Sequence, residues 1–378
     1  MEGGGWCLSK QECQNRSTLY FGSSYYTQKD GPDIFAGILD TDSTLNPYFY
    51  NWHKFFIHYC DGSVYMSDIQ QIEVVLGSNV TFRGARIYNA MIEEMLNRGM
   101  RNAKNAILTG SSAGGLATIL HCDRFRAVFP NSSRVKCISD SGFFIRGKDR
   151  FAYWSERRFG QLIATHQLVD SLPKSCTSKR DPNLCLFPEY LVGDVNTPLF
   201  LVDSTFDSFQ IDYNLKISFG GPTVWSNCTN NFTLCNSTQL GILRDFRSIF
   251  VGALLEVGHS WSRGMFVDSC YRHTNIQYNE GWMCSSFAGN NVLGNKMIGQ
   301  AVADWFFDRS SFEEIDIRNE LPQNCSRPFS PQLLQEKCRV MLSSEPKVST
   351  SFILPTVLYV CLLKLNCMSC WFQLWSFN

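Results

Sequence analysis

The stretch "AILTGSSAGG", Ala106 to Gly115, contains the pattern G-x-S-x-G at Gly110–Gly114. A short apolar run precedes the pattern, and a segment of helical character follows it. In a strand–turn–helix context, the glycines allow a sharp, strained turn that places one serine hydroxyl at the carboxyl edge of a parallel sheet. The spacing selects Ser112, since Ser111 has no glycine two positions before it. The stretch therefore predicts an α/β architecture and a nucleophilic serine. The simpler alternative is a Gly/Ser turn that only begins a helix.

The rest of the chain predicts alternating strands and helices. Short apolar runs bounded by turn residues predict buried strands, and apolar residues at helical spacing predict helices. The expected strands are Lys54–Gly62, Ala106–Gly110, Val135–Asp140 and Thr197–Asp203. The expected helices are Arg83–Met100, Gly115–Phe129, Ser237–Gly258 with Ser237 or Thr238 as its N-cap, and Asn295–Arg309. Such alternation predicts one mostly parallel sheet with helices on both faces.

A nucleophilic serine needs a general base and a carboxylate that orients the base. In the α/β-hydrolase arrangement, the acid follows the serine and the histidine follows the acid. Of six histidines, only His259 and His273 come after the best acid candidates. Asp207 lies just beyond the expected strand Thr197–Asp203, at the edge where active sites form, and Asp203 is its rival. The residue pattern leaves both the choice of histidine and the choice of acid open.

The chain opens on "MEGGGWC", Met1 to Cys7. Acyl transfer places negative charge on a carbonyl oxygen, and each backbone N–H group aimed at that oxygen is worth about 2.7–4 kcal/mol. One donor is normally the residue after the nucleophile, here Ala113, and a second comes from a glycine-rich loop. Gly3–Gly5 predict such a loop, and Trp6 is expected to wall the site. The alternative is a flexible terminus, which a tryptophan and a cysteine directly behind the glycines disfavour.

Composition excludes several function classes. The chain has 378 residues, of which 44% are apolar and 14% aromatic, enough for a large buried core. Its 34 basic and 34 acidic residues give a formal charge of zero. No basic field favours nucleic acid as a partner, and no charge block suggests an interaction tail. We expect a monomer without a nucleic-acid partner.

Sixteen cysteines indicate an oxidising compartment. Three pairs are close in sequence and predict small disulfide loops: Cys7/Cys13, Cys176/Cys185 and Cys228/Cys235. The C-x₂-C spacing typical of zinc sites occurs only at Cys367/Cys370, without a partner pair, so we expect no metal. Seven asparagines begin N-x-[ST] sequons, which favours a secreted glycoprotein. They are Asn15, Asn79, Asn131, Asn227, Asn231, Asn236 and Asn324.

The two ends of the sequence differ from those of an ordinary secreted enzyme. No signal peptide precedes "MEGGGWC", so we expect this sequence to be an N-terminally truncated form of a longer secreted product. At the other end, residues 329–378 are atypical. Their cleanest apolar stretch, Phe352–Leu363, is shorter than the roughly 20 residues of a membrane helix. We expect a tail without a folded role and no membrane span.

Longer phrases of the sequence resemble the plant pectin acetylesterase family, which is related to the animal carboxylesterase Notum. They occur in family order from about residue 1 to residue 310. The phrases are "EGGGWC", "NPYFYNWHKFFIHYCDGS", "FRGARIYNAMIEEML", "AILTGSSAGGLATILHCDRFR", "VKCISDSGFFI", "RDFRSIF", "SRGMFVDSCYRH" and "NK…AVADWFFDR". The resemblance implies an α/β-hydrolase-like domain over residues 1–328. It further implies removal of O-acetyl groups from pectic galacturonan in the cell wall, without a cofactor.

The resemblance also assigns roles by matched motif. It implies Ser112 as nucleophile, Asp207 as acid and His273 as base. Gly5, Trp6 and Ala113 would supply oxyanion N–H groups. Position 111 is serine where plant members typically have cysteine. Two alternatives remain: a Notum-like esterase for a longer acyl chain, and a truncated glycoprotein that binds pectin without turning it over.

Overall fold

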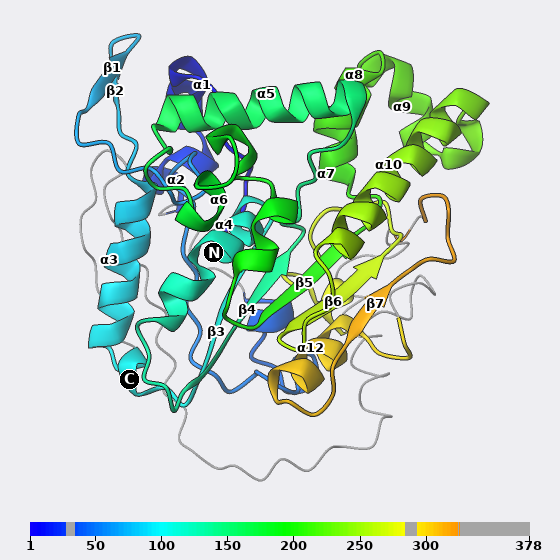
Figure 1. The fold of residues 1–378 in the computed structure, drawn as a ribbon. Coiled ribbons are helices and arrows are strands. Elements are labelled where there is room, and N and C mark those ends of the chain that lie inside the picture. The colour runs from blue at the N-terminus through cyan, green and yellow to red at the C-terminus, as the bar shows by residue number, and fades with distance from the viewer. Residues whose placement is uncertain (28–34, 284–292, 324, 326–378) are drawn as a thin grey trace.

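The computed structural model describes residues 1–27, 35–283, 293–323 and 325. Its centre is a five-stranded sheet in the order β3-β4-β5-β6-β7, in which every neighbouring pair is parallel (Figure 1). The strands are β3 Asn105–Ser111, β4 Arg134–Asp140, β5 Leu199–Ser204, β6 Arg263–Asp268 and β7 Glu313–Ile315. A separate antiparallel hairpin joins β1 Glu73–Val75 to β2 Ser78–Val80. The predicted mostly parallel α/β fold is confirmed.

Alternate residues of the central strands face two different hydrophobic layers. One layer contains Phe200 and Phe266 and packs against α12 (Ile298–Phe306). The other contains Leu201 and Val267 and packs against the three helices α3 Gly84–Asn97, α4 Ala113–Arg126 and α10 Ser237–Glu256. Each fully buried side chain of this kind contributes about 1.5–3 kcal/mol. The sheet is therefore covered on both faces, and only its edges can carry a site.

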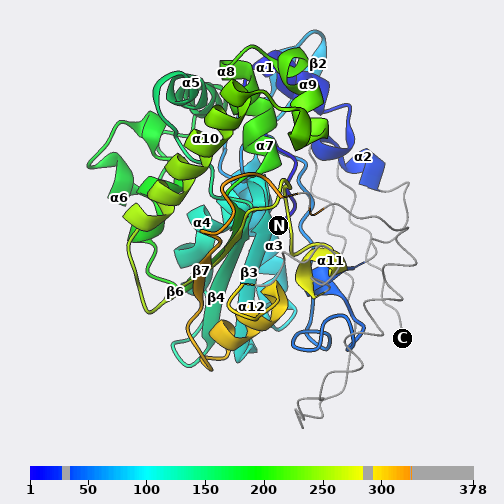
Figure 2. The same cartoon turned by 90° about the vertical axis from the view of Figure 1, so that its right-hand side faces the viewer.

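Helices gather above the carboxyl ends of the strands in both ribbon views (Figures 1 and 2). They include α1 Lys10–Arg16, α5 Asp149–His166, α7 Ser208–Gln210, α8 Lys216–Ser218 and α9 Pro222–Asn230, with a π-helical turn at Ile211–Leu215 between α7 and α8. The remaining short helices are α2 Ser24–Thr27, α6 Lys174–Thr177 and α11 Asn279–Trp282. These helices therefore cover much of the carboxyl edge of the sheet.

The predicted strand Lys54–Gly62 is wrong, because this segment forms no strand. Its backbone instead receives single hydrogen bonds from the start of the chain: Glu2 N–H donates to the Ile57 carbonyl over 3.0 Å. The Met1 nitrogen donates to the Thr109 carbonyl of β3 over 2.6 Å. The first residues therefore lie between β3 and this segment. A strand requires a ladder of repeated bonds, which these isolated contacts do not provide.

The N-cap of α10 also differs from expectation. Asn236, not Ser237 or Thr238, caps the helix: its side chain accepts from Gln239 N–H, and the Gln239 side chain accepts from Asn236 N–H. This reciprocal pair satisfies two N–H groups, whereas a lone hydroxyl satisfies one. The unpredicted elements include the long helix α5 and the sheet strands β6 and β7. In β6 the charged ends Arg263 and Asp268 shorten the apolar run below the length that identifies a strand.

The three predicted disulfide loops are confirmed. Cys7–Cys13, Cys176–Cys185 and Cys228–Cys235 are all bonded. Cys122–Cys137 and Cys270–Cys325 connect more distant positions, which local spacing could not reveal.

Two further expectations concern the surface and the end of the chain. The sequon asparagines within the described residues are all exposed, while Asn324 and the expected tail lie outside them. Among the described residues, every helix is too short or too polar to cross a lipid bilayer.

Candidate active site

Ser112 lies at the sharp turn between β3 and α4. Its backbone has φ 59° and ψ −125°, a left-handed conformation that a residue with a side chain rarely adopts. The flanking glycines are required by contacts within the turn and with the start of the chain: a Cβ at Gly110 would lie 2.3 Å from the Gly114 carbonyl oxygen. A Cβ at Gly110 would lie 2.9 Å from the Met1 carbonyl oxygen, and one at Gly114 would lie 2.7 Å from the Glu2 carbonyl oxygen. The strained strand–turn–helix geometry predicted from G-x-S-x-G is therefore present.

The amino-terminal glycine loop packs directly on this turn. A Cβ at Gly3 would lie 2.8 Å from the Cβ of Ser112, so only a glycine fits there. Gly5 has φ 64°, and a Cβ at that position would meet nothing within 4 Å. Within the described residues, the amide groups of Gly5 and Trp6 donate no hydrogen bond. Ala113 is the first residue of α4, where an N–H group has no acceptor within the helix. Within the described part of the chain, the amides of Gly5 and Trp6 are thus unengaged, two and three residues after the Gly3 that packs on Ser112.

His273 and Asp207 form a buried pair at the same edge. Asp207 follows β5 and His273 follows β6, and Nδ1 of the imidazole lies 2.5 Å from Oδ2 of the carboxylate. The Asp207 side chain is 0% exposed and also caps α7 by accepting from Gln210 N–H. Within the described part of the chain, the buried Nε2 of His273 has no hydrogen-bond partner. Nδ1 is therefore engaged while Nε2 is available to a hydroxyl.

The charge state of His273 follows from two opposing effects. Burial alone acts to lower the pKa of the imidazole, because it disfavours the charged form. The charge and hydrogen bond of Asp207 outweigh burial, so the pKa of His273 is raised above its ordinary value. A histidine of this kind accepts a proton readily and is then stabilised as an imidazolium.

The rival candidates lie elsewhere or are otherwise engaged. Asp203 accepts hydrogen bonds from the backbone N–H groups of Phe143 and Ser204, and burial raises its pKa well above the ordinary range. His259 lies in the loop before β6, at the opposite edge of the sheet, and pairs with Glu313. The structure thus places Ser112, Asp207 and His273 after the carboxyl ends of β3, β5 and β6, with Asp207 bonded to His273, and it places His259 at the opposite edge.

Asp140, which the sequence reasoning missed, joins the serine turn to the histidine loop. Its buried carboxylate accepts from Ser111 Oγ over 2.6 Å and from the backbone N–H groups of Asn275 and Ile276. Its carbonyl also accepts from Ser112 N–H over 2.8 Å. One side chain therefore fixes the residue before Ser112 relative to the residues just after His273. A polar residue that ends a buried strand, as in "CISD", is the signal that could have identified it.

An aromatic group lines the space beside His273. The ring of Phe209 stacks on the imidazole with centroids 5.1 Å apart, and Trp6 meets Phe144 at 5.2 Å and Phe209 at 5.9 Å. Phe209 also contacts Tyr213, with the two rings tilted and their centroids 4.7 Å apart, and Tyr213 is 53% exposed. An aromatic wall thus runs from the catalytic edge to solvent.

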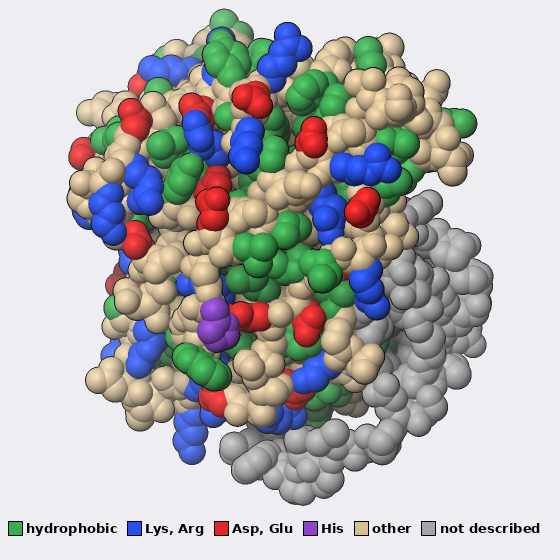
Figure 3. Space-filling model, turned by 45° about the vertical axis from the view of Figure 1, so that its right-hand side comes forward, with side chains coloured by type: hydrophobic (Ala, Val, Ile, Leu, Met, Phe, Trp, Pro, Cys, Tyr) green, Lys and Arg blue, Asp and Glu red, His purple; other side chains and the backbone are tan. Residues whose placement is uncertain are grey.

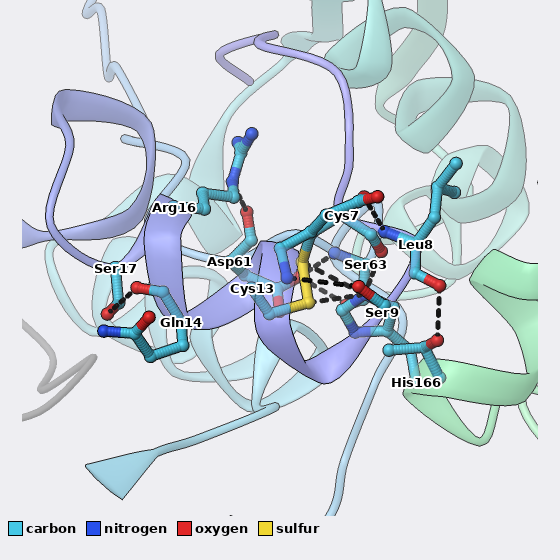
Figure 4. Close-up of a disulfide and its surroundings, with 12 residues drawn as sticks. Cys7, Leu8, Ser9, Cys13, Gln14, Arg16, Ser17, Asp61, Ser63 and His166 are labelled. Atoms are coloured by element: carbon cyan, nitrogen blue, oxygen red, sulfur yellow. Dashed lines mark hydrogen bonds between the residues drawn. A yellow bond between two sulfur atoms is a disulfide. The ribbon is translucent and has the colours of Figure 1, made fainter. Parts of the chain in front are cut away.

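One group within the described residues has the composition of a metal site. The side-chain ligand atoms of Cys7, Cys13 and His166 lie within 4.8 Å of one another (Figure 4). The two sulfur atoms are bonded to each other, and metal ligation requires thiolates. Burial lowers the pKa of His166, and its Nε2 lies 2.9 Å from the Cys7 carbonyl oxygen. The group acts as a structural staple behind the glycine loop.

The surface charge matches the balanced composition. Basic and acidic side chains alternate over the face drawn in Figure 3, and no large area of that face has a single sign. This distribution gives no electrostatic preference for a polyanion on this face.

Comparisons with known proteins place the chain in a family. A family model described as Pectinacetylesterase matches residues 1–326. Pectin acetylesterase 7 of Arabidopsis thaliana is 39% identical over 345 aligned positions, covering 89% of this chain and 84% of that protein. Pectin acetylesterase 11 of the same plant is also 39% identical, over 340 positions with the same coverage.

A solved structure shares the fold. The Wnt deacylase Notum from Drosophila superposes with a TM-score of 0.68 at 23% identity, over 87% of this chain and 89% of that one. At this identity the likeness concerns the fold alone, and it confirms the predicted α/β-hydrolase-like architecture. The family model and the plant relatives show that the chain belongs to the Pectinacetylesterase family and is a carboxylic ester hydrolase.

Proposed function

We propose that the protein is a serine esterase that removes O-acetyl groups from pectin, with Ser112 as nucleophile, His273 as general base and Asp207 as the orienting acid. The buried His273–Asp207 hydrogen bond carries the proposal. A carboxylate on Nδ1 fixes the tautomer in which Nε2 accepts a proton. The contacts of Asp140 support the proposed proximity of this base to the serine turn.

The reaction proceeds in two halves. Nε2 of His273 takes the proton of Ser112 as Oγ attacks the acetyl carbonyl carbon. The resulting oxyanion accepts hydrogen bonds from the amides of Gly5, Trp6 and Ala113. The imidazolium then gives its proton to the departing sugar oxygen, which leaves an acetyl-enzyme. Water, deprotonated by the same histidine, attacks this ester and releases acetate.

The aromatic packing favours a short acyl group over a long one. Trp6 contacts Phe144, Phe159 and Phe209 with centroid distances of 5.2–5.9 Å, so these rings fill the space beside the glycine loop. A long chain would have to displace several of them, whereas an acetyl group needs little room. The plant relatives are named for acetyl esters, in agreement with this choice.

The exposed ring of Tyr213 supports a carbohydrate substrate. It extends the aromatic wall outward from His273 and offers a flat face on which a sugar ring of a polymer can pack. The disulfides and the family are consistent with the secretory pathway. We therefore place the reaction in the plant cell wall, on acetylated galacturonan.

The test compares neighbouring serines on a small chromogenic acetate and on acetylated pectin. Ser112→Ala is expected to lower kcat by about 10⁶-fold, and Ser111→Ala by less than about tenfold, because Asp140 keeps its backbone donors. The wild-type kcat/KM is then measured for a series of esters whose acyl groups have two to sixteen carbons. Residual turnover by Ser112→Ala near the wild-type rate would refute the mechanism, and a preference for the long esters would refute the acetyl assignment.

A further inference from the structure

Arg16, the last residue of α1, reaches back to the glycine loop. Its Nη1 donates to the Gly4 carbonyl oxygen over 2.7 Å, and its Nε donates to the Asp61 carbonyl oxygen over 3.3 Å. Its guanidinium lies over the ring of Tyr59, 4.8 Å from the centroid. Figure 4 shows Arg16 turned toward Asp61 beside the Cys7–Cys13 disulfide. Contacts on three sides fix the plane of the guanidinium.

The bond to Gly4 sets the direction of the next amide. The structure contains no cis peptide among its described residues, so the Gly4–Gly5 peptide is trans. In a trans peptide the carbonyl oxygen and the following N–H point to opposite sides. Because Arg16 holds the Gly4 oxygen on one side, the Gly5 N–H is directed to the other. Gly4 and Gly5 have φ 125° and 64°, and such glycine backbone can rotate easily unless it is held.

Helix α1 gives Arg16 a fixed base. The Cys7–Cys13 disulfide ties the residue directly after Trp6, which precedes the helix, to the middle of α1. Thr165 Oγ1 donates to the Leu8 carbonyl over 2.9 Å, which attaches the same turn to α5. The glycine loop is therefore held at both ends: covalently through Cys7 and by Arg16 at Gly4.

We propose that Arg16 is a positioning residue for the oxyanion site, which directs the Gly5 N–H toward the developing negative charge. This inference rests on the proposed function, because it assumes acyl transfer at Ser112. Loss of one oxyanion donor costs about 10²- to 10³-fold in kcat. A donor that is present but no longer held costs less, so we expect a loss of about 10- to 100-fold. The effect falls on kcat and leaves KM nearly unchanged, because the interaction strengthens only in the transition state.

The experiment uses Arg16→Met, which keeps the aliphatic length but removes the donors, and Arg16→Lys. Each is assayed with 4-nitrophenyl acetate and with the corresponding thionoacetate, whose sulfur is a poor acceptor in an oxyanion site. In the wild type, the oxygen ester is expected to react much faster than the sulfur ester. In Arg16→Met this preference is expected to shrink by about 10-fold, and in Arg16→Lys by less. A purely structural role would lower the active fraction, measured by burst titration, without changing the oxygen-to-sulfur ratio.

Arg124→Met is the matched control. Arg124 also lies over a tyrosine ring, 5.8 Å from the centroid of Tyr88, and also makes side-chain hydrogen bonds. It lies eleven residues into α4, about 16 Å from the start of that helix. The Arg124→Met variant is therefore expected to keep the wild-type ratio of oxygen-ester to sulfur-ester hydrolysis.

The outcomes separate the two proposals. An unchanged ratio in both Arg16 variants, with Ser112→Ala inactive, overturns the role of Arg16 alone. Activity retained by Ser112→Ala overturns the proposed function and this inference with it. If Arg16→Met fails to fold, the ratio in Arg16→Lys decides.

Discussion

Among the residues that the structure describes, two histidine–carboxylate pairs of almost the same length lie at opposite edges of one sheet. His273 Nδ1 and Asp207 Oδ2 are 2.5 Å apart, and His259 Nδ1 and Glu313 Oε2 are 2.6 Å apart. The His273 and Asp207 side chains are 18% and 0% exposed, whereas those of His259 and Glu313 are 59% and 23% exposed. Water screens the second pair, which is worth about 0–1 kcal/mol. Distance alone therefore does not distinguish the two pairs; burial and position at the carboxyl edge do, and they favour His273–Asp207 for the proposed catalytic role.

The largest expected difference comes from replacing each histidine with glutamine. His273→Gln is expected to lower kcat by about 10⁵- to 10⁶-fold, because the proposed triad loses its general base and the remaining two residues cannot replace it. His259→Gln is expected to change kcat by less than twofold and stability by less than about 1 kcal/mol. Ester hydrolysis and thermal unfolding measure both. A comparable loss of activity in the two variants would show that burial does not distinguish the pairs.

Replacing the carboxylate of each pair and measuring the pH dependence of kcat/KM gives a second comparison of the two pairs. Asp207→Asn is expected to lower kcat by about 10⁴-fold, and Glu313→Gln to leave kcat unchanged. Asp207 raises the pKa of His273. The wild-type kcat/KM is therefore expected to decrease as the pH drops through an apparent pKa that lies above 6.5, the ordinary value of histidine. Without Asp207, burial dominates and the acid limb moves to lower pH. An acid limb that stays in place in Asp207→Asn contradicts the assignment.

Replacing Asp140 tests whether activity depends on the link between the serine turn and the loop that follows His273. Asp140→Asn puts an N–H₂ group against the N–H groups of Asn275 and Ile276, so the histidine loop is expected to shift. A displacement of about 1 Å costs about 10²-fold in rate. The measurement is kcat on a small acetate, with Asp316→Asn as control, since Asp316 accepts from Ser269 Oγ outside the site. Equal effects in the two variants would assign Asp140 to stability alone.

The smallest expected effect concerns the rim of the catalytic edge. Tyr213→Ala is expected to raise KM for acetylated pectin by about 2- to 10-fold, from a ring contact worth about 0.5–1.5 kcal/mol, and to leave a small acetate unaffected. Tyr153→Ala is the control, because Tyr153 is 60% exposed but pairs only with Trp154 among the described aromatic rings. A change on the small ester would mean that Tyr213 acts on the chemistry rather than on the polymer.

Local rules explain which parts of the fold the sequence could predict. The apolar runs of β3, β4 and β5 and the periodic helices α3, α4 and α10 depend on near neighbours, and the structure contains all of them. The segment Lys54–Gly62 has the composition of a strand but lacks a ladder partner, which no local pattern reports. β6 was missed for the converse reason, since its pairing with β5 and β7 compensates for charged ends.

The candidate site likewise contains features that follow from local sequence and features that depend on tertiary contacts. The sequence by itself determined the turn at Ser112, because its glycine spacing is a local steric requirement. Only the tertiary structure decided which histidine meets which acid, since His273 and Asp207 are 66 positions apart and contact depends on where β5 and β6 end. The contacts of Arg16 were likewise beyond sequence reasoning, and of Asp140 the sequence shows only that a polar residue ends a buried strand. Several of the groups that these two side chains bind are backbone groups, which every residue carries and which only the folded chain brings within reach.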